Sequence, residues 1–385
     1  MATIYGTSRA DELYDSAGND KIYGYAGNDV INGWNGGTDV VAAGAGDDHV
    51  VEHAHPREHR APLPVALDAH GLGSLRPFAF ATASVAAFVA PLFFGAMADR
   101  HGAAMAYGSY EALLTDREVE AVYIPLPNHL HVPWAIRAAE AGKHVLCEKP
   151  LGLSEADAWP LLEASKRTGR LIQEAFMVRT HPQWLKAREL VAGGRIGELK
   201  AITGHFSYHL TDPTNVRNVK DWGGGGLLDI GCYPITTSRL VTGLEPRRVA
   251  ALLEPDPVMG IDRLGAVLLD FPGVAASFTY GTQLVPRQTM EFHGTTARLV
   301  VEIPFNAPND RPCRLLIHDG AELGLAVTET IELPACDQYG VMGDRFAEAV
   351  LDGTPQPVPL EDSLANLRVI DAVFRAGDRG SWQAV

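Results

Sequence analysis

The segment AVYIPLPNHLHVPWAIRAAEAGKHVLCEKPLGLS, residues 121 to 154, decides the fold class of this chain. It predicts a strand over 121–125, a helix over 132–141 and a second strand over 144–147, because short apolar runs flank a stretch of helical periodicity. Strands and helices that alternate in this way build a parallel sheet covered by its crossover helices. We therefore expect an α/β domain here.

Elements of the same kind lie on both sides of this segment. A helix is predicted over 110–114, and Ser154 with Asp157 three residues later forms an approximate capping box for another helix. Residues 171–176 then return as a strand. Beyond Pro246 the pattern changes. The runs GAVLLDF, VAASFTYG, TMEFHG, ARLVVEI and CRLLIHD, divided by Gly, Pro and Asp turns, predict an antiparallel sheet.

Two short helices are predicted to close the chain, over 346–351 and 364–374. The first hundred residues are less regular. Residues 53–76 are rich in Pro and His without periodicity, which is typical of a linker. The 22 uncharged residues that follow, 77–98, are long enough to cross a bilayer as a helix.

The bulk composition limits the classes of partner. The chain has 385 residues, 46% of them hydrophobic, and a formal net charge of −15, which argues against a nucleic-acid partner. Its four cysteines stand singly, without CxxC or metal-ligand spacing. The amino terminus has neither the basic patch nor the apolar core of a secretory signal. We therefore expect a cytoplasmic protein, with a secreted or membrane-associated one as the alternative because of the first hundred residues.

The first fifty residues carry a short repeat. Five aspartates at positions 11, 20, 29, 39 and 48 are 9, 9, 10 and 9 residues apart, and AGND recurs before apolar pairs. This pattern resembles the RTX nonapeptide repeat, which implies a small parallel β-roll. In that family aspartate oxygens bind calcium between stacked turns, which here implies Asp20, Asp29, Asp39 and Asp48. A flexible Gly/Asn/Asp-rich leader is the alternative.

The end of the apolar stretch, FFGAMADRHG at 93–102, resembles the second helix and following loop of a major facilitator transporter. One such helix cannot form a transport pathway, so this is a fragment at most. The competing interpretation is a distorted βα unit with a strand over 65–67 and a Gly-rich turn in GLGSLR. That turn has only two of the three glycines of a GxGxxG loop, and Pro77 would lie in the first turns of its helix.

Polar residues gather where the predicted parallel strands end. PNHLH at 127–131 and EKP at 148–150 follow two neighbouring strands, and ligands of such sheets bind at this edge. In order along the chain, YIPLPNHLH, AGKHVLCEKPLGLS, QEAFMVR and GGGGLLDIGCYP resemble the Gfo/Idh/MocA oxidoreductase family over about residues 100–385. The variety with Tyr after Asp-x-Gly-x, like dihydrodiol and xylose dehydrogenases, is the most similar.

Three residues are predicted to carry catalysis. Asp229 and Tyr233 are four apart, so on a helix they project from one face. A phenol with an ordinary pKa near 10 needs a neighbouring cation to act in proton transfer, and Lys149 is the candidate. The resemblance implies that Tyr233 exchanges the substrate proton, Lys149 holds substrate and cofactor, and Asp229 orients substrate hydroxyls. Hydride would pass to or from NAD or NADP.

The resemblance also implies residues around this centre. Pro127, Asn128, His131, Glu148 and Lys149 would line the cofactor crevice, although a loop-capping Asn and a packed His remain open. For the substrate, Arg179 is a candidate contact, and Trp222 either contacts it or packs in the core. The substrate would be a sugar or diol, and the open antiparallel sheet would join copies into a homo-oligomer.

The resemblance predicts five segments: 1–52 repeats, 53–105 linker and apolar segment, 106–178 Rossmann-like dinucleotide-binding domain with its amino half missing or degenerate, 179–360 α+β substrate and oligomerisation domain, and 361–385 a helix returning to the cofactor domain. The missing part includes the loop whose backbone N–H groups would hold the pyrophosphate. Three hypotheses follow. The chain is an NAD(P)-dependent sugar or diol oxidoreductase with an irregular front, a catalytically impaired fusion product, or a calcium-binding repeat or membrane-attached protein.

Overall fold

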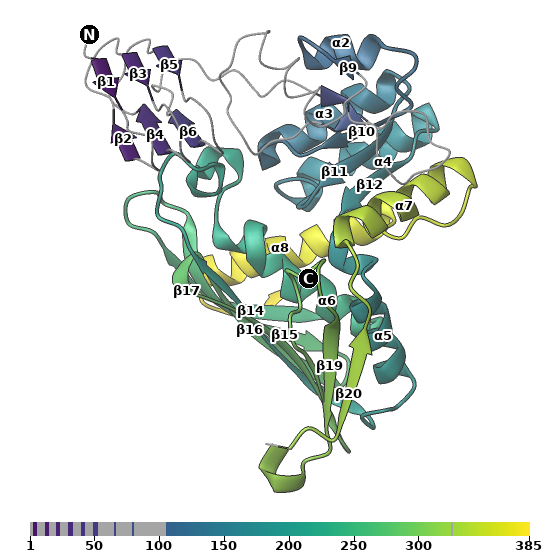
Figure 1. Cartoon of the computed structure of the whole chain (residues 1–385). Helices are drawn as coiled ribbons and strands as arrows, with labels where there is room; N and C mark the ends of the chain where they lie inside the picture. Colours follow the sequence, from purple (N-terminus) through teal and green to yellow (C-terminus); the bar gives the residue numbers. More distant parts are fainter. Residues whose placement is uncertain are drawn as a thin grey trace. The chain divides into compact units, whose positions relative to one another are not determined.

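The computed structural model describes residues 107–385 apart from Leu325, together with nine short strands between residues 3 and 106 (Figure 1). The chain divides into two compact units. The first comprises residues 1–62 and 86–90, and the second comprises residues 63–85 and 91–385. Among the described residues no helix is long and apolar enough to cross a membrane. The predicted apolar stretch 77–98 lies outside the described residues except for one short strand.

The first unit contains two parallel three-stranded sheets between which successive strands alternate. Thr3 pairs with Lys21 and Glu12 with Val30, a separation of 18 residues, so one coil contains two nine-residue repeats. This is the topology of the predicted β-roll. Its aspartates Asp20, Asp29, Asp39 and Asp48 lie outside the described residues. The strands are β1 (Thr3–Tyr5), β2 (Glu12–Tyr14), β3 (Lys21–Tyr23), β4 (Val30–Gly33), β5 (Val40–Ala42) and β6 (His49–Glu52).

The second unit begins with a six-stranded sheet in the order β12-β11-β10-β8-β7-β9. The three predicted parallel strands are confirmed as β10 (Ala121–Ile124), β11 (His144–Glu148) and β12 (Ile172–Ala175). Beside β10 lies β8 (Ala79–Phe80), also parallel. The remaining strands, β7 (Val65–Ala66) and β9 (Met105–Ala106), are antiparallel to their neighbours. The predicted strand at 65–67 is thus present as β7, but the predicted βα unit is wrong where its helix should begin, because β8 is a strand there.

Helices pack on this sheet through small side chains. The helices are α2 (Tyr110–Thr115), α3 (His131–Glu140) and α4 (Glu155–Thr168). Ser154 starts α4 as predicted, since its hydroxyl accepts a hydrogen bond from the Asp157 N–H at 3.1 Å. Ala135 and Ala158 are fully buried on α3 and α4. Helix α3 contacts β10 and β11, and α4 packs against α3.

A nine-stranded sheet forms the second part of this unit, in the order β20-β19-β18-β17-β13-β16-β15-β14-β21. All neighbours are antiparallel except β13 and β16, so the predicted antiparallel sheet contains one parallel pair. Its strands are β13 (Leu199–His209), β14 (Arg248–Pro255), β15 (Asp262–Phe271), β16 (Val274–Gly281), β17 (Gln283–Gly294), β18 (Arg298–Val301), β19 (Cys313–His318), β20 (Glu329–Leu333) and β21 (Gln383–Ala384).

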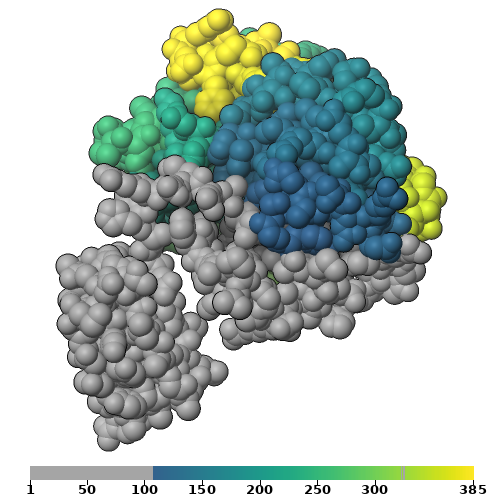
Figure 2. Space-filling view, turned by 90° about the horizontal axis from the view of Figure 1, so that it is seen from above, coloured from purple at the N-terminus to yellow at the C-terminus, as the bar shows by residue number. Residues whose placement is uncertain are grey.

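Four α-helices accompany this sheet: α5 (Pro182–Ala192), α6 (Cys232–Thr242), α7 (Gln338–Leu351) and α8 (Leu360–Arg379). The predicted closing helices are both present but longer. Helix α7 begins at Gln338, because Asp337 caps it by accepting from the Tyr339 N–H at 3.0 Å. Helix α8 contacts α4 and β12 of the first part of this unit and β14 of the nine-stranded sheet. Figure 2 shows this C-terminal segment, in yellow, beside the surface of the first sheet's domain, in blue.

Candidate active site

Lys149 lies at the carboxyl end of β11, where the chain turns through the cis Lys149–Pro150 peptide bond. Its side chain is 12% exposed, and its ammonium donates to the Asp229 backbone oxygen and lies 3.3 Å from the Asp229 carboxylate. The same nitrogen lies 5.0 Å from the centre of the Tyr233 ring. Burial lowers the pKa of Lys149, but the charges of Tyr233 and Asp229 raise it above its ordinary value. Lys149 is therefore a retained cation in a nearly dry site.

Asp229 receives donors from three directions. Besides Lys149, the Tyr208 hydroxyl donates to it at 2.6 Å, and Arg217 Nε lies 3.3 Å from the carboxylate on the solvent side. Burial raises the pKa of Asp229, but Lys149 and Arg217 hold it below the ordinary value. Asp229 is therefore an ionised carboxylate whose position is fixed by its partners.

Tyr233 lies one turn after Asp229, at the start of α6, in an aromatic box. The rings of Phe176, Phe206 and Phe305 lie 4.9, 5.5 and 5.3 Å from its own, and the side chain is 6% exposed. Its hydroxyl donates to Met177 Sδ at 3.6 Å, a weak acceptor. Burial raises the pKa of Tyr233 and Lys149 lowers it, with burial the larger effect. The hydroxyl is therefore protonated and nearly uncommitted.

The predicted cluster of Lys149, Asp229 and Tyr233 is thus one site, although Lys149 lies over the Tyr233 ring and not beside its hydroxyl. Glu148 stands behind it. Its carboxylate accepts from the Tyr123 hydroxyl and from the Lys149 N–H, and burial raises the pKa of this carboxyl. Glu148 therefore ties β10 to the turn that carries Lys149.

The loop after β10 connects the two halves of the site. Asn128 donates its amide to the Gly223 carbonyl at 2.9 Å, and His129 stacks on Trp222 with ring centres 5.7 Å apart. Glycine is needed at position 223 because a Cβ there would collide with Leu153 and would lie 2.9 Å from Asn128 Cβ. The loop therefore fixes the residues just before Asp229.

His131 is placed differently from the prediction that it lines the cofactor crevice. Its ring is fully buried, with Nδ1 2.7 Å from the Pro150 carbonyl oxygen and Nε2 2.6 Å from that of Leu126. Burial lowers the pKa of His131 despite both carbonyls. The ring links the end of β10 to the turn at Lys149 and has no face left for a ligand.

Arg179 also differs from its prediction as a substrate contact. Its guanidinium pairs with Asp362 of α8 at 2.9 Å, and Asp362 pairs on its other side with Arg239 at 2.9 Å. Desolvation lowers the pKa of Arg179. The contact joins the end of the first sheet to α8.

Glu174, on β12 beside this ion pair, is 2% exposed and accepts from the Leu151 N–H at 2.9 Å. Burial raises its pKa to about 7, with Asp362 raising it further and Arg179 opposing. The folded state therefore holds the Glu174 proton more tightly than the unfolded chain does. This stabilises the folded state below the unfolded pKa, and the stabilisation is lost as pH rises through 7. We expect Glu174→Gln to exceed the wild type in unfolding free energy by about 1–3 kcal/mol at pH 8 and to match it near pH 5.

The measurement for Glu174→Gln is the difference in Tm from the wild type, taken at each pH from 5 to 8. Glu163→Gln, on the exposed surface of α4, is the control and should show no such trend. A constant difference across this range would contradict the raised pKa of Glu174.

Residues 223–226, just before Asp229, are all glycine because larger side chains would not fit there. Gly225 has φ 128°, and a Cβ there would collide with Asp262 Oδ1. The Asp262 carboxylate accepts from the Leu227 N–H at 2.7 Å and from the Tyr280 hydroxyl at 2.6 Å. It therefore anchors the π-helix η5 (Leu227–Gly231), which carries Asp229.

We expect Gly225→Ala to lower the free energy of unfolding by about 2–4 kcal/mol, since it adds backbone strain to a collision with Asp262. Thermal unfolding measures the loss. Gly343→Ala, within α7 and with no heavy atom within 4 Å of the added Cβ, is the matched control and should be neutral or stabilising. Equal Tm values for the two variants would show that the glycine run tolerates a side chain.

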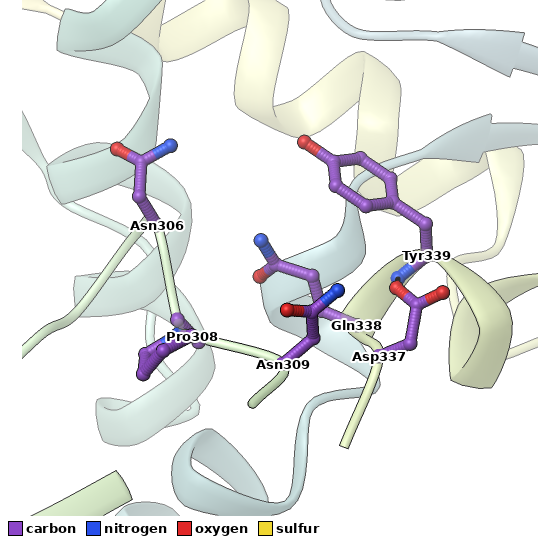
Figure 3. Close-up of a pocket in the computed structure, with 7 residues that line it drawn as sticks. Asn306, Pro308, Asn309, Asp337, Gln338 and Tyr339 are labelled. Carbon is purple, nitrogen blue, oxygen red and sulfur yellow. Dashed lines mark hydrogen bonds between the residues drawn. The ribbon is translucent and has the colours of Figure 1, made fainter. Parts of the chain in front are cut away.

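A hollow of about 250 Å³ opens between the segment 306–309 and the start of α7 (Figure 3). It is lined by Asn306, Ala307, Pro308, Asn309, Asp337, Gln338 and Tyr339. Figure 3 shows Gln338 reaching into the hollow between Asn306 and Tyr339. None of these residues was predicted, because they carry no motif and meet only through the fold.

Comparison with known proteins covers both parts of the second unit. A family model for oxidoreductases with an NAD-binding Rossmann fold matches residues 80–176, and one for the GFO/IDH/MocA C-terminal domain matches residues 184–300. An uncharacterised oxidoreductase of Rhizobium meliloti is 47% identical over 75% of this chain and 87% of its own length. The chain belongs to the Gfo/Idh/MocA oxidoreductase family. The segment that resembles a transporter loop, 93–102, falls inside the Rossmann match.

Other Gfo/Idh/MocA relatives of this chain are oxidoreductases too. D-xylose 1-dehydrogenase (NADP+) 2 of Haloferax volcanii is 37% identical over 74% of this chain and 86% of its own. A 3-ketoreductase of Actinomadura kijaniata, solved with NADP and TDP-benzene, has TM-score 0.68 and 34% identity over 73% of this chain and 85% of its own. The RTX calcium-binding nonapeptide model matches residues 5–37 and 35–51. The chain is thus an NAD(P)-dependent oxidoreductase of this family that carries RTX repeats.

Proposed function

We propose that this enzyme transfers hydride between a nicotinamide cofactor and a carbon that bears a hydroxyl or carbonyl in a sugar or diol. The proposal depends chiefly on one observation, the buried cluster in which the Lys149 ammonium contacts Asp229 and lies over the Tyr233 ring. Relatives named as a xylose dehydrogenase and a 3-ketoreductase support the substrate class. Structures of that ketoreductase with a tyrosine changed to phenylalanine and a lysine changed to alanine support the choice of residue types.

Tyr233 is the proposed general acid and base. Its raised pKa keeps the hydroxyl protonated, so in carbonyl reduction it can donate its proton to the substrate oxygen. That donation leaves a phenolate, which the Lys149 ammonium stabilises, and in the reverse direction this phenolate accepts the proton of the substrate hydroxyl. Asp229, held by Tyr208 and Arg217, orients substrate hydroxyls beside it.

The described residues fit the nicotinamide half of the cofactor. The carboxyl ends of parallel β10 and β11 bring Pro127, Asn128 and Lys149 to the sheet edge where such cofactors bind. Bound there, the nicotinamide ring supplies or accepts the hydride. We propose that His131 and Glu148 act indirectly, by positioning the turn at Lys149. Trp222, half-buried against His129, remains a proposed contact of the substrate.

The proposed homo-oligomer would form through the exposed face of the nine-stranded sheet. Leu252 and Val285 on this sheet are 76% and 78% exposed, and Leu268 is 48% exposed. Large apolar side chains clustered on a sheet face mark an interaction surface. The free cysteines Cys147, Cys232, Cys313 and Cys336 support the proposed cytoplasmic location.

The RTX match supports a second function for the first unit, calcium binding by Asp20, Asp29, Asp39 and Asp48. Calcium would then raise the Tm of this unit, because a ligand that binds only the folded state stabilises it. If the Tm of the full chain were the same in millimolar calcium and in chelator, this second function would be ruled out.

A titration of the full chain with NADPH and with NADH, followed by nicotinamide fluorescence, tests the main proposal. We expect saturable binding in the micromolar range, and then reduction of NAD or NADP by an aldose at 340 nm. No binding of either cofactor would mean that the front half of the sheet does not form a pyrophosphate site. The chain would then be the catalytically impaired alternative.

A further inference from the structure

The hollow in Figure 3 adjoins Tyr233 through two separate contacts. Phe305, whose ring packs on Tyr233 at 5.3 Å, immediately precedes Asn306. On the opposite wall, α7 contacts the short helix η2 (Met177–Arg179), whose Met177 accepts from the Tyr233 hydroxyl. Burial and the Glu148 charge raise the pKa of Tyr339, while Lys149 opposes them.

Gln338 supplies an unpartnered polar group to the lining of this hollow. The residue is 5% exposed, and its amide oxygen is buried without a hydrogen-bond partner among the described residues. A buried polar atom left unpaired is costly, so native proteins seldom retain one without a reason. Figure 3 shows this side chain directed into the hollow, where a ligand hydroxyl could donate to it.

Asn306 offers the complementary group. Its amide oxygen accepts from Gln288 Nε2 at 2.9 Å, and Gln288 Oε1 in turn accepts from the Asn306 N–H at 3.0 Å. This pair fixes the loop and leaves the Asn306 amide nitrogen as a donor. Figure 3 shows that nitrogen on the side of Tyr339. The hollow thus presents a fixed acceptor and a fixed donor on opposite walls.

The lining selects neutral polyols. Amide groups both donate and accept, as sugar hydroxyls do, and the Tyr339 ring adds an apolar face with a polar tip. The seven lining residues include no Lys or Arg, and the acid among them, Asp337, already caps α7. A phosphate would find no cation there. The volume of about 250 Å³ is below the usual range for drug-sized ligands, as expected for a monosaccharide.

We infer that Asn306, Gln338 and Tyr339 form a subsite for the hydroxyls of a free, unphosphorylated sugar, remote from the carbon that reacts at Tyr233. This inference rests on the proposed function and narrows its substrate class. Among sugars, the subsite favours a neutral aldose over a nucleotide-linked one. Gln338 would then contribute to discrimination, because a site built to bond a hydroxyl rejects ligands that lack it.

The test is equilibrium binding to the full chain, measured by calorimetry with D-xylose, D-glucose, D-galactose and L-arabinose, and with thymidine diphosphate as the anionic probe. In Gln338→Leu we expect the Kd of the best sugar to rise at least about tenfold, the effect of one lost hydrogen bond. We expect its Tm to equal or exceed that of the wild type, since the unpaired oxygen is gone. A purely structural Gln338 would instead lower the Tm.

Gln383→Leu is the matched control, because Gln383 lies on β21, at the opposite edge of the sheet from β20. It should leave all sugar affinities unchanged. Three results would overturn the subsite: no saturable binding of any of the four sugars, an unchanged Kd in Gln338→Leu, or tighter binding of thymidine diphosphate that Gln338→Leu weakens. If a sugar bound in a Gln338-dependent way but no hydride passed to NAD or NADP, the subsite would be supported and the proposed function would be contradicted.

Discussion

Tyr233→Phe is expected to lower kcat for sugar oxidation by about 10³-fold and to leave the Kd for NADPH within about twofold. The substitution removes the hydroxyl that we propose exchanges the substrate proton. It should leave the fold intact, because that hydroxyl has only the weak contact with Met177 Sδ. The ring contacts with Phe176, Phe206 and Phe305 need no hydroxyl. The loss should therefore appear in kcat and not in stability.

Initial rates at 340 nm from pH 6 to 10 measure this effect. The wild type should gain activity as pH rises in the oxidative direction, because the tyrosine must act as a base, and Tyr233→Phe should lose that dependence. Tyr107→Phe is the matched control. It removes a hydroxyl that donates to Asp116 at 2.6 Å, on a residue outside the site, and should retain the wild-type rate. A Tyr233→Phe enzyme with a tenth or more of the wild-type rate would show that another group transfers the proton.

The sequence predicts the cluster of Lys149, Asp229 and Tyr233 from two local patterns together with the family resemblance. Asp229 and Tyr233 follow from their spacing of four on a helix, and Lys149 follows from its place after a parallel strand. The structure brings these three residues together and adds Tyr208 and Arg217, which fix the Asp229 carboxylate. Neither could be found from local pattern. Tyr208 comes from β13 and Arg217 from a short loop helix, η3 (Val216–Asn218), and only tertiary folding brings them to Asp229.

Long-range partners could not be found from the local pattern either. Arg179 is predicted as a substrate contact, and the structure pairs it with Asp362, 183 positions later on α8. For His131 the sequence leaves a cofactor contact and a packed ring open, and the structure shows a buried ring bonded to the carbonyls of Leu126 and Pro150. A charged or aromatic side chain beside a motif has no local feature that separates a ligand contact from an interior bond. Motif spacing therefore locates a site better than it assigns the neighbours of that site.

The largest loss of activity is expected for Lys149→Met, which should reduce kcat/KM by about 10³–10⁴-fold. The variant removes the cation that stabilises the Tyr233 phenolate and the proposed contact with the cofactor, so the Kd for NADPH should also rise. Breaking a buried ion pair costs about 3–5 kcal/mol when the other charge is left alone. The loss of stability should be smaller here, because Asp229 keeps its contacts with Arg217 and Tyr208.

The double variant Lys149→Met/Asp229→Asn separates the two roles of Lys149. It removes both charges of the buried pair, so we expect it to regain most of the stability that Lys149→Met loses while remaining as inactive. Lys143→Met is the control for loss of a buried lysine, since Lys143 is 5% exposed and, within the part of the chain that the structure describes, donates to the Asp116 carbonyl. Its rate per folded molecule should equal that of the wild type. If the double variant recovered activity together with stability, Lys149 would be a structural partner of Asp229, and the proposed pairing of Lys149 with Tyr233 would have to be abandoned.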